Sequence, residues 1–111
     1  MLEQQLASFV ERGFCVVPDA LDAATVARLR SSMEWHRAAR PEAWRLWGES
    51  RDGGPSGEAG RWQSYSILHD TIEFDCCIEH PTVGPLVARL LGPEGCLQTA
   101  TTRYREPVRA P

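Results

Sequence analysis

The sequence contains no lysine: all twelve of its basic residues are arginine. It also lacks an apolar run of the roughly 18 to 20 residues that a membrane-spanning helix needs. Its first residues, MLEQQLASFVERG, have neither the basic start nor the apolar run of a signal peptide. These absences predict a cytoplasmic protein with no membrane partner.

No two cysteines are spaced as C-x2-C, the pattern that begins many structural zinc sites. Cys76 and Cys77 are adjacent, whereas Cys15 and Cys96 are isolated. We therefore expect small, buried, reduced side chains at these positions. The formal net charge is −3, and the arginines are scattered along an acidic chain without forming a basic stripe, which predicts no nucleic-acid partner.

The chain has the length of one small domain, and its hydrophobic fraction of 42% is typical of a globular protein. Helical spacing of apolar residues predicts a first helix that ends at Gly13. Asp22 is placed as the N-cap of a longer helix, residues 23–38, and a third helix is predicted over residues 82–91. The apolar faces predict one shared core, made by Phe14, Val26, Leu29, Leu86 and Leu90.

The remaining segments predict a few strands and turns. The run FCVVP and the stretches RWQSYSIL and CLQTATTRYRE have the composition of strands. The segment rich in glycine, proline and serine, SRDGGPSGEAG, is typical of a solvated surface loop, with a lid as the alternative. PEAWRLWGES and TIEFDCCIEH each predict one or two helical turns. The fold class is therefore α+β, mainly helical, in a single domain over residues 1–111.

Two stretches together resemble a known family. FVERGFCVVPDALDAATVARLR is similar to the N-terminal signature of the phytanoyl-CoA dioxygenase family, in which a helix, a Gly-Phe entry, a Pro-Asp turn and a second helix precede the catalytic barrel. EHPTVGPLVARLLGPEGCLQ resembles a second landmark of that family, a His-Pro start followed by a helix that ends in Leu-Leu-Gly. The resemblance covers residues 9–30 and 79–107.

The resemblance implies a non-haem Fe(II), 2-oxoglutarate-dependent oxygenase that hydroxylates a small organic substrate on a double-stranded β-helix, a jelly-roll fold. In this class two histidines and one carboxylate hold the metal and leave three positions for the cosubstrate and O2. The family's His-x-Asp pair should follow TTRYREPVRAP, so the resemblance implies a chain truncated before its metal ligands and an incomplete jelly roll. The three histidines occur as HRA, HDT and HPT, and none offers His-x-Asp.

Other polar residues receive structural interpretations. His36 lies on the apolar stripe of the long helix, which is typical of a satisfied, partly buried histidine. His69 and Asp70 are neighbours that cannot readily converge on one ion, so a turn with a side-chain cap is expected there. His80 precedes Pro81 and is expected to cap the last helix. The acidic group of Glu73, Asp75 and Glu79 predicts a solvated face.

The last strand carries the candidate cofactor-binding residues Gln98, Thr102 and Tyr104, because alternate residues share a face and the family implies that one face of this strand looks into the barrel toward 2-oxoglutarate. Ordinary strand packing is the alternative. No metal ligand or catalytic residue is assigned. The resulting hypothesis is the N-terminal part of an oxygenase, inactive alone, with a non-enzymatic interaction module or one subunit of a split oxygenase as the alternative partner-binding function.

Overall fold

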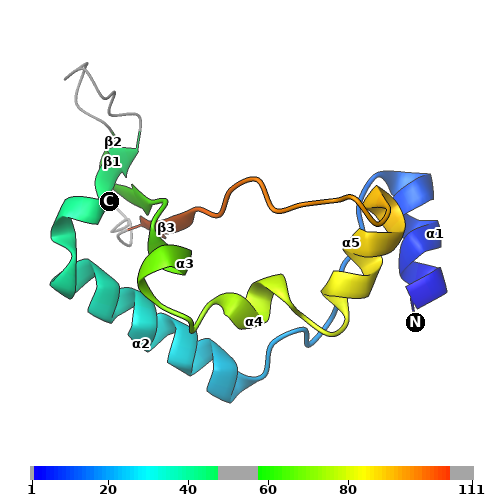
Figure 1. Cartoon of the computed structure of the whole chain (residues 1–111), viewed down its shortest axis with the longest axis horizontal. Coiled ribbons are helices and arrows are strands. Elements are labelled where there is room, and N and C mark those ends of the chain that lie inside the picture. The colour runs from blue at the N-terminus through cyan, green and yellow to red at the C-terminus, as the bar shows by residue number, and fades with distance from the viewer. Residues whose placement is uncertain (1, 48–57, 106–111) are drawn as a thin grey trace, which may run out of the picture.

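The computed structural model describes residues 2–47 and 58–105. Helices α1 and α5 lie together at one end, a small sheet lies at the other, and helix α2 and an extended segment run between them (Figure 1). The elements are α1 (Leu2–Arg12), α2 (Ala23–Ala39), the 3-10 turn η1 (Pro41–Ala43), β1 (Arg45–Trp47), β2 (Glu58–Ser64), α3 (Ile67–Asp70), α4 (Asp75–Ile78), α5 (Val83–Leu91) and β3 (Thr102–Arg105). This mixture of helices with an antiparallel sheet confirms the α+β class.

The three main helices begin and end close to where the sequence predicts. Gly13 ends α1 with a φ of 81° and donates its backbone N–H to the Phe9 carbonyl at 2.7 Å. The Asp22 carboxylate caps α2 by accepting the N–H of Thr25 at 2.7 Å. Gly92 ends α5 with a φ of 82°. None of the described helices is long and apolar enough to cross a membrane.

His80 caps the start of α5, as predicted. Its Nδ1 accepts the backbone N–H groups of Thr82 and Val83, each at 3.1 Å. Its Nε2 bonds to the carbonyl oxygen of Ala20 in the turn before α2. Since Nδ1 accepts twice and a carbonyl can only accept, the proton of this imidazole lies on Nε2. One side chain thus satisfies a helix start and ties together segments 60 residues apart.

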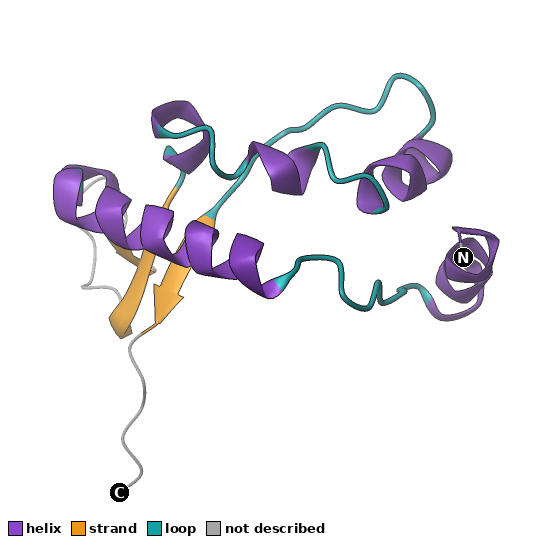
Figure 2. Ribbon diagram, turned by 90° about the horizontal axis from the view of Figure 1, so that it is seen from below, coloured by secondary structure: helices purple, strands orange, loops and turns teal. Residues whose placement is uncertain are grey.

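The sheet has the order β1-β2-β3 and is antiparallel throughout. Opposite pairs include Leu46 with Trp62 and Trp62 with Tyr104, so these side chains share one face. That face is half-buried and lies toward α2 (Figure 2), whereas Arg103 and Arg105 alternate outward along β3.

Several strand predictions are wrong, because a strand forms only where a partner is available. Residues 14–18 are extended but unpaired among the described residues, and β3 begins only at Thr102 rather than near Cys96. The stretch 61–68 stops pairing at Ser64 and then enters α3. Residues 45–47, predicted as part of a helical turn, form β1 instead because β2 lies beside them. Of the predicted surface loop, residues 50–57 lie outside the described residues and 58–60 belong to β2.

The predicted single core is also wrong. Leu29 and Leu86 are buried, but Phe14, Val26 and Leu90 are 53%, 47% and 36% exposed. Helix α5 packs against α1, while α2 packs beside η1 and α3, so the apolar faces do not meet. The Cα radius of gyration is 16.9 Å, against about 13 Å for a compact domain of this length.

The cysteines are reduced, but they are less buried than predicted. Cys77 and Cys96 are exposed, and Cys15 and Cys76 are half-buried. The reason is the same open arrangement, since Cys77 and Cys96 both face a groove that no described element covers.

Candidate functional site

The structure brings together only two of the three candidate cofactor-binding residues. Thr102 and Tyr104 lie in β3 on the face turned toward α2. Gln98 is exposed, precedes the strand and lines a different part of the surface. The prediction that all three share one strand face is therefore wrong for Gln98, because the chain from Cys96 to Thr101 pairs with no described strand.

Tyr104 contributes to packing rather than to an open site. The guanidinium carbon of Arg37 lies 3.6 Å from the centre of the Tyr104 ring and 5.7 Å from that of Trp44. A cation over an aromatic face is attracted by the ring quadrupole. Arg37 therefore attaches α2 to the inner face of the sheet, and Tyr104 is half-buried beneath it.

Gln98 lies along an apolar groove of about 560 Å³ between α4, α5 and the segment that follows α5. We refer to it as the α4–α5 groove. Leu91 and Leu97 are 64% and 56% exposed on its lining, and Ile78 and Val87 are 42% and 43% exposed. The groove offers apolar contacts and the two thiols of Cys77 and Cys96, but no charged side chain lines it.

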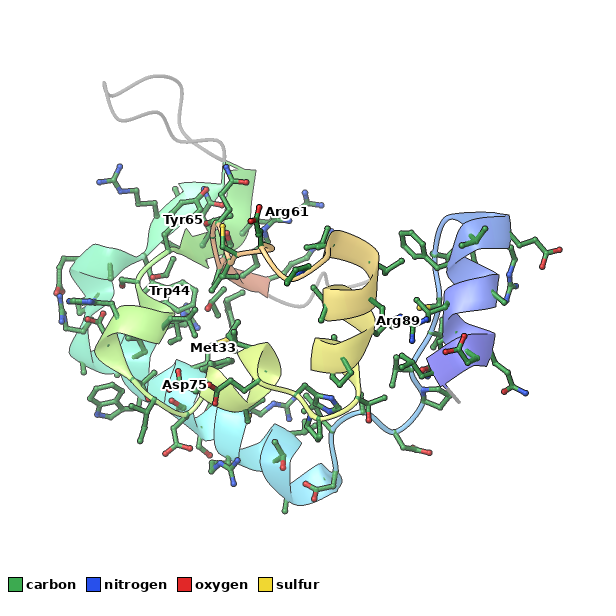
Figure 3. All side chains as sticks on the ribbon, turned by 45° about the vertical axis from the view of Figure 1, so that its right-hand side comes forward. Met33, Trp44, Arg61, Tyr65, Asp75 and Arg89 are labelled. Atoms are coloured by element: carbon green, nitrogen blue, oxygen red, sulfur yellow. The ribbon has the colours of Figure 1, made fainter. Side chains whose placement is uncertain are left out.

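The most completely buried polar site is a network around His36, which is 0% exposed. The indole N–H of Trp44 donates to His36 Nδ1 at 2.9 Å. An indole nitrogen is only a donor, so Nδ1 carries no proton and His36 is neutral. Its Nε2–H then donates to Asp70 Oδ2 at 2.7 Å. Figure 3 shows Trp44 in the space between α2 and the strands.

Asp70 collects the other donors of this network. Its Oδ2 also accepts the hydroxyl of Ser66 at 3.0 Å, and its Oδ1 accepts Arg40 Nη1 at 3.2 Å. Only 6% of the Asp70 side chain is exposed. The hydrogen bond from His36, together with those from Ser66 and the charge of Arg40, holds the pKa of Asp70 below its ordinary value. Asp70 is therefore a carboxylate at neutral pH.

A carboxylate bonded to a buried imidazole has the composition of a general-base pair, but this one has no free base. The nitrogen that would take a substrate proton already accepts from Trp44, and the ring is inaccessible to solvent. The network instead ties α2, η1 and α3 together. The sequence predicts His36 as a satisfied buried histidine and Asp70 in a turn, and both predictions are confirmed, but their pairing was missed because 34 residues separate them.

The lowered pKa of Asp70 predicts acid-sensitive stability. A carboxyl group whose pKa is lower in the folded than in the unfolded chain stabilises the fold above the unfolded value, and this contribution is lost as the pH falls through the folded value. The unfolded value is 3.8. The free energy of unfolding should therefore hold between neutral pH and about pH 5 and fall below about pH 4.

Urea unfolding followed by tryptophan fluorescence at several pH values checks this prediction. Asp22 and Glu42 also have lowered pKa values, through hydrogen bonds with Thr25 and Arg40, and contribute with the same sign. Asp70→Asn should make the acid decline shallower than in the parent chain. An identical decline in both chains would contradict the assignment to Asp70.

The described residues do not fit the metal centre that the resemblance implies. Both nitrogens of His36 and both of His80 are occupied by hydrogen bonds, and His69 is exposed and stands apart from them. Within residues 2–47 and 58–105, no three His, Cys, Asp or Glu side chains are grouped so that they could hold a metal ion. Glu73 pairs with Arg28 at 2.9 Å, and Asp75 and Glu79 are exposed, as the solvated-face interpretation predicts.

No protein family, curated protein or solved structure was found to match this chain.

Proposed function

We propose that this chain is the N-terminal scaffold of a phytanoyl-CoA dioxygenase-like oxygenase, which would hydroxylate a small organic substrate in the cytoplasm. The metal ligands would come from outside the described residues. The observation that carries this proposal is the bond between His80 and Ala20. It joins the two stretches that bear the family resemblance, so these stretches form one structural unit rather than two unrelated patterns.

The contact between α1 and α5 supports the same unit. Arg89 of α5 donates to the Glu3 carboxylate of α1 at 3.2 Å, and the two helices pack together (Figures 1 and 3). The three-stranded sheet is proposed as part of a double-stranded β-helix, which needs about eight strands. Additional strands would pair with the open edges of β1 and β3 and would cover the exposed apolar side chains.

The second candidate function is a non-enzymatic interaction module, or one subunit of a split oxygenase. The α4–α5 groove favours it, because Leu91 and Leu97 are exposed beside extended backbone that pairs with no described strand. Apolar surface of this kind is typical of a site that another chain covers. Both candidates share the expectation that a complementary polypeptide completes the fold.

The oxygenase proposal is tested by supplying the missing chemistry. The purified chain, given Fe(II) and 2-oxoglutarate, should form no succinate and should bind Fe(II) only weakly, because its histidines are occupied or isolated. Isothermal titration with Fe(II) under anaerobic conditions and a succinate assay measure both quantities.

Addition of a chain that carries the His-x-Asp region and the remaining barrel strands should give 2-oxoglutarate-dependent O2 consumption. Complex formation without O2 consumption would favour the interaction module instead. A tight, stoichiometric Fe(II) site or succinate formation by the chain alone would contradict the assignment of the metal ligands to residues outside this chain.

A further inference from the structure

Strand register gathers arginines that are scattered in the sequence onto one face of the sheet. Arg61 lies opposite Arg105, and Gln63 lies opposite both Arg45 on β1 and Arg103 on β3. Residues opposite each other in an antiparallel sheet share a face, as do alternate residues along one strand. Four of the twelve arginines therefore lie on the face that points away from α2, which we call the arginine face (Arg45, Arg61, Gln63, Arg103 and Arg105).

This concentration of charge is unfavourable by itself. Like charges directly opposite in a sheet repel each other, as Arg61 and Arg105 do here, and Arg103 is a diagonal neighbour of Arg61. Arg61 and Arg103 already take part in interactions within the chain. The argument therefore depends on the density of positive charge on this face and not on any unpaired cation.

The arginine face is also hollowed. Arg61, Arg103 and Arg105, with Trp62 and Tyr104 between them, line a depression of about 320 Å³. Arg103 and Arg105 are exposed and Arg61 is half-buried. Figure 3 shows Arg61 on β2, away from Arg89 of the α1–α5 end. Three guanidinium groups thus surround a space that holds a small molecule.

We propose that this depression binds the phosphate group of a small phosphorylated molecule. Guanidinium groups match phosphate oxygens with paired N–H donors, and a tetrahedral dianion accepts from several directions at once. A single carboxylate is planar and is satisfied by fewer such groups. This assignment goes beyond the proposed oxygenase function and does not depend on it.

The probe is inorganic pyrophosphate, titrated calorimetrically into the full 111-residue chain at constant ionic strength. Saturable binding of one equivalent is expected. Arg105→Gln should raise the Kd by about tenfold, because it removes a charge-assisted, bidentate donor. Arg105→Lys keeps the charge but loses the fork, so its Kd should lie between those of the parent and of Arg105→Gln.

Arg30→Gln is the matched control, since Arg30 is exposed on α2 and the substitution removes the same charge. Its Kd should stay within about twofold of the parent value, as expected for a distant, screened charge. Circular dichroism verifies that each variant is folded. Equal weakening by Arg30→Gln, absence of saturable binding in the folded parent, or preferential binding of citrate would overturn the proposal. Binding of a single-stranded oligonucleotide without binding of pyrophosphate would overturn it as well.

Discussion

His36→Ala should lower the free energy of unfolding by about 3 kcal/mol, which places it among the most damaging single substitutions in this chain. The imidazole is fully buried and receives or makes hydrogen bonds on both nitrogens. Its removal leaves a cavity, an indole N–H without an acceptor at Trp44 and a carboxylate at Asp70 that has lost its shortest hydrogen bond. Urea unfolding at neutral pH, followed by circular dichroism, measures the change.

Two further variants separate the causes of this loss. His36→Phe refills most of the volume but restores neither hydrogen bond, so its stability should remain well below that of the parent chain. His69→Ala is the control, because His69 is exposed, and its effect should stay within about 0.5 kcal/mol. If His36→Phe were as stable as the parent, the polar network would contribute nothing beyond packing.

Leu86→Asp should unfold the α1–α5 end of the molecule. Leu86 is 5% exposed on α5, and a carboxylate at this position would lose its hydration without gaining a described cation as its partner. The expected loss is at least about 3 kcal/mol, and the helical signal at 222 nm should fall at room temperature.

Leu91→Asp is the matched variant on the same helix, at a position that is 64% exposed. It should cost less than about 1 kcal/mol, mainly through the unfavourable charge at the helix C-terminus. Leu91 also lines the α4–α5 groove, so this variant should fold normally but bind a complementary chain more weakly. If Leu86→Asp and Leu91→Asp were equally stable, the burial of α5 against α1 would be in doubt.

The helices were predictable because their signals are local. Asp22 caps α2 through a residue three positions away, and Gly13 and Gly92 end their helices through their own backbone conformation. His80 was recognised as a cap for the same reason, since its Nδ1 bonds to residues two and three positions later.

Strands and the polar network were harder to predict because they depend on partners distant in sequence. FCVVP has the composition of a strand but no described neighbour, whereas Arg45–Trp47 forms a strand because β2 pairs with it. The strand TRYR was predicted, but its facing was not, because the position of Arg37 above Tyr104 decides which face is covered. As a result, the candidate ligand-binding face passed from Thr102 and Tyr104 to the arginines between and beside them.

The three hydrogen bonds of the two histidines close loops of very different length. Trp44 and His36 are 8 residues apart, His36 and Asp70 are 34 apart, and Ala20 and His80 are 60 apart. Chain entropy makes the longest of these closures about 2 kcal/mol less favourable than the shortest. The α2–η1 corner can therefore form early in folding from local contacts, whereas the bond at His80 forms late. By the same reasoning, this bond opens first when the chain unfolds partially, so the two ends of the molecule separate before either end loses its own structure.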